Sequence, residues 1–178
     1  MIFLQSNITP VFAFLTLVSN VVFVLCAVAF FVSKDFKTWV KNFLNENILS
    51  LLFGFSFVAM AGSLSYSQIV GFPPCELCWI QRIFMYPQVL IAFIAAYMKD
   101  KSAVVYMVSL SVIGAAVAFF HSMIHWGFNS SLLKCSAVGA PCAKVYILEY
   151  GYITLPFMAF TSFVYLAALG IVYLKSKN

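Results

Sequence analysis

The sequence predicts an all-α integral membrane protein, made of a four-helix transmembrane bundle, one additional N-terminal transmembrane helix and an interfacial amphipathic helix. Of the 178 residues, 64% are hydrophobic and only 8% are charged, and the mean hydropathy is +1.03. A soluble domain carries about 25% charged residues, so this chain has too few to cover a globule in water. Most of the surface must face lipid, which excludes a soluble enzyme, a nucleic-acid binder and a disordered tail.

Five apolar stretches are long enough to cross a bilayer, which requires roughly 20 residues per helix. These stretches are 9–32, 48–69, 79–98, 103–126 and 152–174. We therefore divide the chain into an N-terminal part, 1–47, and a four-helix unit, 48–178. The connection 127–151 is the longer of two loops and is expected to lie outside the membrane.

The first stretch, 9–32, is predicted to be a retained anchor rather than a cleaved signal peptide. No positive charge precedes it, and its apolar run exceeds the usual length of about 7–15 residues. The segment that follows it, 33–47, has apolar and basic side chains on different faces of a helix, which is typical of a helix lying in the membrane interface. The apolar face holds Phe36, Trp39, Val40, Phe43 and Leu44, and the basic face holds Lys34, Lys37 and Lys41.

Lysine positions predict the orientation, because cytoplasmic loops collect Lys and Arg. Seven lysines follow the first, third and fifth stretches, namely Lys34, Lys37, Lys41, Lys99, Lys101, Lys175 and Lys177. The opposite side has only Lys134 and Lys144. We expect the N-terminus outside the membrane and the C-terminus inside the cell.

Four of the five cysteines fall on the predicted outer side, where disulfides persist. Cys26, within the first stretch, is expected to be inert. Pro73 and Pro74 precede the Cys75-Glu-Leu-Cys78 motif and end the structure before it. Cys75 is therefore expected near the start of the third helix and Cys78 in its first turn, where free N–H groups and the helix dipole stabilise a thiolate.

Gln81 and Arg82 follow this cysteine pair on the third helix. Arg82 lies four residues after Cys78 and thus one turn away on the same face. Charged residues at membrane depth are functional candidates, so we predict that Arg82 stabilises a Cys78 thiolate and polarises an electron acceptor beside it. The alternative is that Arg82 extends to the outer interface. Gln81 either assists in this site or packs at the interface.

Cys135 and Cys142 enclose six residues of the outer loop, and Lys134 should favour a thiolate at Cys135. As a structural disulfide, this pair would stabilise the fold by only about 2.5 kcal/mol. So small a contribution favours exchange chemistry over a structural role. A purely structural role for this disulfide is one alternative. Another is a zinc ion held by the four outer cysteines, but zinc sites of four cysteines usually have two closely spaced Cys pairs, and here two residues separate one pair and six residues separate the other. We predict no metal.

His121 and His125 share one face at the outer end of the fourth stretch. Imidazole titrates near neutral pH, so these side chains could hydrogen-bond a bound quinone or manage its protons. They could equally be interface residues that water and lipid headgroups satisfy.

Two motifs resemble the DsbB/BdbC disulfide bond formation family, particularly its shorter BdbC-like branch. The first is Pro-Cys-Glu-Leu-Cys-Trp-Ile-Gln-Arg-Ile-Phe-Met-Tyr-Pro at residues 74–87. The second comprises Cys135, Cys142 and Tyr146, followed by Gly-Tyr-Ile-Thr-Leu-Pro-Phe at 151–157. The resemblance covers roughly 48–174, and the N-terminal helix and amphipathic segment are additions to the family pattern.

This resemblance implies a membrane thiol oxidase of the bacterial cytoplasmic (inner) membrane, with a thioredoxin-like, DsbA-type dithiol partner and a noncovalently bound membrane quinone, either ubiquinone or menaquinone. The redox-active pairs would be Cys75–Cys78 and Cys135–Cys142. In the family scheme, the partner attacks the loop pair, Cys142 then attacks Cys75, and the released Cys78 contacts the quinone beside Arg82. No nucleic acid is expected to bind.

Two other functions stay open from the sequence. One is a membrane reductase that carries electrons from inside the cell to keep outer thiols reduced. Such a carrier should have paired cysteines within its spans, where only Cys26 lies. A non-catalytic membrane scaffold, with disulfides or zinc bracing the outer loop, is the alternative from a different class.

Overall fold

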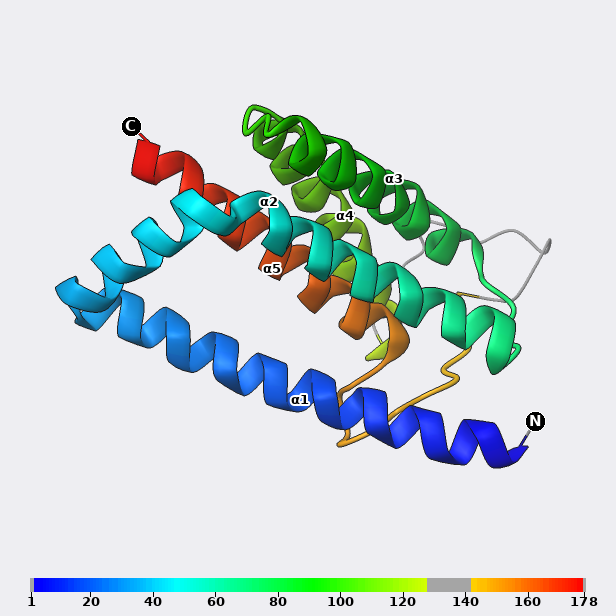
Figure 1. The fold of residues 1–178 in the computed structure, drawn as a ribbon. Coiled ribbons are helices and arrows are strands. Elements are labelled where there is room, and N and C mark those ends of the chain that lie inside the picture. Colours follow the sequence, from blue (N-terminus) through cyan, green and yellow to red (C-terminus); the bar gives the residue numbers. More distant parts are fainter. Residues whose placement is uncertain (1, 128–141, 178) are drawn as a thin grey trace.

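Five long helices make up most of the chain in the computed structural model (Figure 1). The structure describes residues 2–127 and 142–177. For residues 2–8 it describes the backbone but not the side chains. The helices are α1 (Ile2–Val32), α2 (Lys34–Leu64), α3 (Glu76–Met98), α4 (Ala103–His125) and α5 (Leu155–Lys177). Each contains a stretch long and apolar enough to cross a membrane. The predicted all-α membrane class is confirmed.

Helices α2 to α5 form a bundle, and α1 lies along its outside against α2 and α5 (Figure 1). The bundle core is a cluster of buried aliphatic and aromatic side chains from all four helices, including Leu52, Met85, Met107 and Phe163. Few residues of the α1 span are buried in the isolated chain, and many of its apolar side chains are exposed. Such an apolar exposed surface is stable only in lipid, as the composition predicts.

The predicted interfacial segment, 33–47, does not form a separate helix but makes up the first turns of α2. The helix continues into the membrane span because residues 34–53 contain no Gly or Pro that would end it. Ser33 caps the start of α2, where its hydroxyl oxygen accepts a hydrogen bond from the Phe36 N–H at 3.3 Å. At its other end α2 passes into a π-helical turn, Ser65–Ile69.

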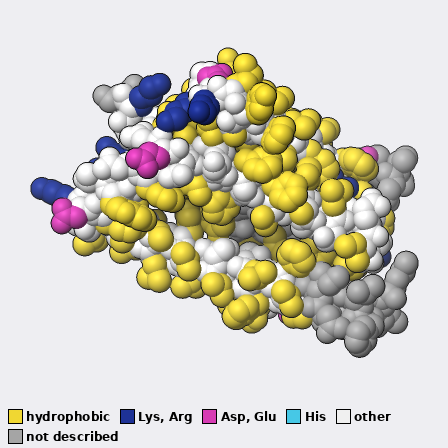
Figure 2. Space-filling model, in the orientation of Figure 1, with side chains coloured by type: hydrophobic (Ala, Val, Ile, Leu, Met, Phe, Trp, Pro, Cys, Tyr) yellow, Lys and Arg dark blue, Asp and Glu magenta, His cyan; other side chains and the backbone are white. Residues whose placement is uncertain are grey.

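Charged side chains gather at one end of the molecule, around the C-terminus and the turn between α3 and α4, and much of the remaining visible surface is hydrophobic (Figure 2). The Lys101 ammonium donates a hydrogen bond to the backbone oxygen of Asn45, and the Ser176 hydroxyl donates to the Asn45 side-chain oxygen at 3.4 Å. These contacts join α2, the α3–α4 turn and α5. The side of the membrane that this end faces stays a prediction.

Two glycines allow α4 and α5 to approach closely. A Cβ atom added to Gly114 would lie 2.3 Å from the ring of Phe163, and one added to Gly170 would lie 2.3 Å from Val108. Phe163 is fully buried in the bundle core, so an added Cβ at Gly114 would force its ring to shift. The α4–α5 contact therefore fixes the position of α4, whose C-terminal end carries the histidines.

We predict that Gly114→Ala lowers the stability of the protein by about 1–3 kcal/mol, because overpacking a tight core forces the helices apart. Gly54→Ala is the matched control, since a Cβ at that helical position meets nothing within 4 Å. Thermal unfolding in detergent, followed by circular dichroism, measures both variants. Equal unfolding temperatures for the two variants would contradict the close α4–α5 contact.

Candidate functional site

Cys75 and Cys78 lie at the start of α3, as the sequence predicts. Cys75 is the N-cap residue, with an extended backbone, and its sulfur accepts a hydrogen bond from the Cys78 N–H at 3.3 Å. The two sulfurs are 2.7 Å apart. Cys75 is buried and Cys78 is half-buried. The pair is therefore close enough for the two sulfurs to exchange a proton or to form a disulfide.

The surroundings of Cys75 favour its thiolate. Its pKa is lowered to about 4, mainly by the hydrogen bond from the Cys78 thiol and further by a hydrogen bond from His121, while burial opposes both effects. A thiol with a low pKa is a good leaving group in thiol–disulfide exchange. Cys75 is thus suited to be the sulfur that enters and leaves a mixed disulfide.

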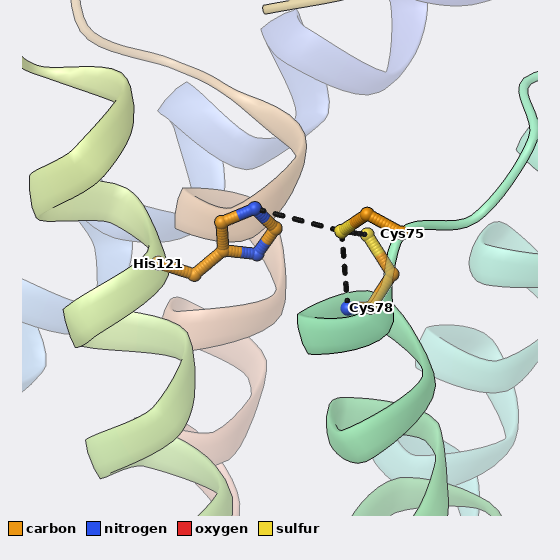
Figure 3. Close-up of side chains that lie close together, drawn as sticks. All are labelled: Cys75, Cys78 and His121. Atoms are coloured by element: carbon orange, nitrogen blue, oxygen red, sulfur yellow. Dashed lines mark hydrogen bonds between the residues drawn. The ribbon is translucent and has the colours of Figure 1, made fainter. Parts of the chain in front are cut away.

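His121 is the residue that joins this pair to its surroundings (Figure 3). It is 1% exposed, and its Nε2 lies 3.8 Å from the Cys75 sulfur and 3.2 Å from the carbonyl oxygen of Cys142. Its Nδ1 lies 2.9 Å from the side-chain nitrogen of Gln81, which can only donate. The network therefore assigns the neutral tautomer with its hydrogen on Nε2, facing Cys75 and Cys142.

Cys142 is held on the opposite side of His121 from Gln81. His125 Nε2 also donates to the Cys142 carbonyl oxygen, at 3.0 Å, so this one oxygen accepts from both histidines. Cys142 is 4% exposed, is disulfide-bonded and packs in the same small cluster as Cys75. Cys135 and Lys134 lie outside the described residues, so the predicted Cys135–Cys142 pairing stays a prediction.

A cavity of about 480 Å³ lies on the other side of the cysteine pair, between α1, α2, α3 and α5. Cys78, Gln81 and Arg82 line it, whereas the structure does not place His121 or His125 among its lining residues. The two histidines therefore contact Cys142 rather than the space in which a quinone was expected. The cysteine pair lies between two environments, because both cysteines pack in the cluster that contains Cys142 and Cys78 alone of the two also lines the cavity.

Arg82 is held at the cavity by α2. Its Nε donates to the Ser63 hydroxyl oxygen at 3.2 Å, its Nη2 donates to the Ser63 carbonyl oxygen at 3.4 Å, and its guanidinium carbon lies 5.3 Å from the centre of the Trp79 ring. The Tyr86 hydroxyl also donates to Ser63, at 3.2 Å. These contacts fix a positive charge on the same helical face as Cys78.

Several polar residues around the cavity were given no role from the sequence, although Tyr146 stands in the second family motif. Tyr86 could have been found, because it continues the four-residue spacing of Cys78 and Arg82, but no sequence signal points to Ser63. Tyr66 and Tyr146 line the cavity, and their hydroxyls are buried without a hydrogen-bond partner in the described part of the chain. Burial and the nearby cysteine charges raise the pKa of Tyr146, so it is a hydrogen-bond donor at neutral pH. Two such donors favour a ligand with acceptor oxygens.

The sulfurs of Cys75 and Cys78 and a nitrogen of His121 lie within 4.8 Å of one another and are the types of atom that zinc prefers. In a tetrahedral zinc site with Zn–S lengths of about 2.3 Å, two sulfurs lie about 3.8 Å apart. The cysteine sulfurs are 2.7 Å apart, so a metal would have to separate them. This arrangement favours redox exchange between the sulfurs over metal binding.

The helical fold and this cysteine site together define a class, namely integral membrane proteins with a candidate thiol–disulfide centre at one helix start. The family model of "Disulfide bond formation protein DsbB" matches residues 45–173. The chain therefore belongs to the DsbB family. All of α1 and the first turns of α2 precede the matched residues.

Curated relatives carry related names. "Probable disulfide formation protein" of Oceanobacillus iheyensis is 38% identical over 134 residues, which cover 75% of this chain and 92% of the relative. "SPbeta prophage-derived disulfide bond formation protein B" of Bacillus subtilis is 41% identical over 141 residues, covering 79% and 91%. "Disulfide bond formation protein C" of Bacillus subtilis is 42% identical over 107 residues, covering 60% and 78%. No solved structure matches the chain. Family membership makes this a membrane protein of disulfide bond formation.

His121→Ala is expected to raise the pKa of Cys75, because it removes one of the hydrogen bonds that lower it. The thiolate is the reactive form, so alkylation of Cys75 in the reduced wild type should stay fast down to about pH 4 and fall off below it. The fall should begin at higher pH in His121→Ala. Mass spectrometry of the alkylated Cys75 peptide gives the rate at each pH, and an unchanged pH profile would rule out the His121 contact.

Proposed function

We propose that the protein is a membrane thiol oxidase that reoxidises a thioredoxin-like, DsbA-type dithiol partner outside the cytoplasm and passes the electrons to a membrane quinone. The proposal combines the DsbB family membership with the geometry of the cysteine site. It accounts for two features together, a cysteine pair at a helix start and a further cysteine packed against it.

The observation that carries the proposal is the two-sided position of the cysteine pair. Cys75 contacts His121 and packs with Cys142, while Cys78 lines the cavity with Arg82. Electrons that arrive as a thiolate at Cys142 can enter the pair at Cys75 and leave it from Cys78. One pair can then serve a protein dithiol and a lipid-soluble acceptor without the two meeting.

The cavity residues fit a quinone. A volume of about 480 Å³ falls within the range of small-molecule sites, and its lining is mainly apolar with a few polar groups. Arg82, Gln81 and the hydroxyls of Tyr66 and Tyr146 are the groups that would hold the quinone oxygens. When bound, a quinone supplies a two-electron acceptor that takes up two protons.

The exchange order follows from which sulfur is free at each stage. In the proposed route, the partner dithiol reduces the loop disulfide, and the Cys142 thiolate attacks Cys75 of the Cys75–Cys78 disulfide. The new Cys75–Cys142 bond releases Cys78 as a thiolate. Cys75 can then no longer accept a proton from Cys78, so the negative charge stays on Cys78 beside Arg82. His121 and the Cys78 N–H stabilise Cys75 when it leaves as a thiolate in the next exchange.

Cys78→Ser should abolish oxidation of a reduced DsbA-type protein by quinone, with a loss of at least about a thousandfold, because the sulfur that faces the acceptor is gone. Cys26→Ser is the matched control and should keep wild-type turnover, since Cys26 is exposed on α1 and makes no part of the site. Quinone absorbance follows the reaction with purified protein. Undiminished turnover in Cys78→Ser, or none in the wild type, would favour the scaffold function instead.

A further inference from the structure

The helix that precedes the family match forms one wall of the cavity. Cavity-lining residues on α1 are Phe12, Leu15, Thr16 and Ser19. They face the same space as Cys78 and Arg82 of α3. An added membrane anchor would need no such position, so α1 has a place in the site itself.

Polar contacts fix α1 against the bundle at this level. The hydroxyl of Tyr165 on α5 donates to the side-chain oxygen of Asn20 and lies 3.3 Å from the Ser19 hydroxyl. The Phe23 ring packs on Tyr165, with centroids 4.6 Å apart. Polar side chains within a membrane are costly unless they pair, so these contacts hold α1 in one register on α5.

Aromatic rings continue the attachment toward the cysteine site. Phe12 packs on Tyr66 at a centroid distance of 5.4 Å, Tyr66 stacks with Phe72 at 6.2 Å, and Phe72 stacks with Tyr146 at 4.7 Å. All four side chains line the cavity. This row of aromatic side chains joins α1 to Tyr66 and Tyr146, which are proposed to hold the quinone oxygens. The α1 residues and these tyrosines therefore form one continuous wall of the cavity.

The α1 side of the cavity offers a ligand no free hydrogen-bond donor. The Thr16 hydroxyl donates to the Phe12 carbonyl oxygen at 2.8 Å, and the Ser19 hydroxyl donates to the Thr16 carbonyl oxygen at 2.9 Å, which satisfies both within the helix. Facing them on α2 are Phe55 and Val58. This end of the cavity is therefore mainly apolar, and its hydroxyl donors are used within the protein, whereas the α3 end carries Cys78, Gln81 and Arg82.

The apolar end also borders the lipid. Leu15, Phe55 and Val58 line the cavity and yet are 56%, 43% and 65% exposed on the surface that faces the bilayer. A molecule in the cavity could extend between α1 and α2 into lipid at this point. A polar head end and an apolar, lipid-bordering end match a ligand with an oxygen-bearing ring and a long hydrocarbon tail.

We infer that α1 builds the binding subsite for the hydrocarbon tail of the electron acceptor, so that this chain selects tailed quinones over their tail-less rings. The inference rests on the proposed quinone-linked function and adds to it a residue set, Phe12, Leu15, Phe55 and Val58, from two helices. The added helix thereby contributes to acceptor selection as well as to membrane anchoring.

Leu15→Trp tests this inference by filling the lipid-bordering end of the cavity. Binding to the purified, fully oxidised protein is measured by calorimetry with decylubiquinone and its tail-less ring, and in parallel with phylloquinone and menadione. One misplaced methylene in an apolar pocket changes affinity by about 10–200-fold, so we expect Leu15→Trp to weaken binding of the tailed quinones by about tenfold or more. Tail-less quinones should change much less.

Leu25→Trp is the matched control. Leu25 is the same residue type on the same helix, is 63% exposed and does not line the cavity, so Leu25→Trp should bind all four compounds as the wild type does. Wild-type affinity for tailed quinones in Leu15→Trp, or equal weakening with tailed and tail-less compounds, would overturn the inference. Because oxidised protein has no electrons to transfer, binding is scored separately from turnover. Failure of the oxidase function would appear as absent turnover with the Leu15 effect intact.

Discussion

His121 is the side chain on which the arrangement of the site depends. It is 1% exposed near the C-terminal end of α4, so both ring nitrogens need partners within the protein. Gln81 donates to one nitrogen, and this leaves the N–H of the other for the Cys142 carbonyl oxygen and the Cys75 sulfur. One neutral imidazole thereby joins α3, α4 and the segment containing Cys142. The close α4–α5 contact at Gly114 in turn fixes the helix that carries it.

This position gives the two cysteines of the pair different surroundings. Cys75 has the hydrogen-bond donors and the packed cysteine, and Cys78 has the cavity and the arginine. A protein dithiol and a lipid-soluble acceptor arrive from different phases, so a pair placed between two environments suits both. On our proposal, α1 adds the apolar wall that the lipid-soluble acceptor needs.

The sequence predicted the helices because their length, apolar composition and flanking lysines are local properties. Cys75 at the helix start was predictable for the same reason, since two prolines precede it. The sequence predicted a helix over 33–47 but not that it joins the second span in one helix, α2, because a change from amphipathic to apolar composition does not mark a helix end. The roles of Ser63 and of Phe12 could not be predicted, because each depends on which helix packs against which. The histidines were recognised as candidates, but their contact with Cys142 depends on the path of the chain between α4 and α5.

The central claim, that Cys142 is held where it can bond Cys75, is tested most directly by a double variant, Cys78→Ala with Cys135→Ala. This protein retains only Cys26, Cys75 and Cys142. After mild oxidation in the membrane, peptide mapping under non-reducing conditions should find a Cys75–Cys142 disulfide in most molecules. Adding His121→Ala should reduce its yield. If Cys75 and Cys142 stay as free thiols, or if Cys75 pairs only with Cys26 or between molecules, the account is wrong.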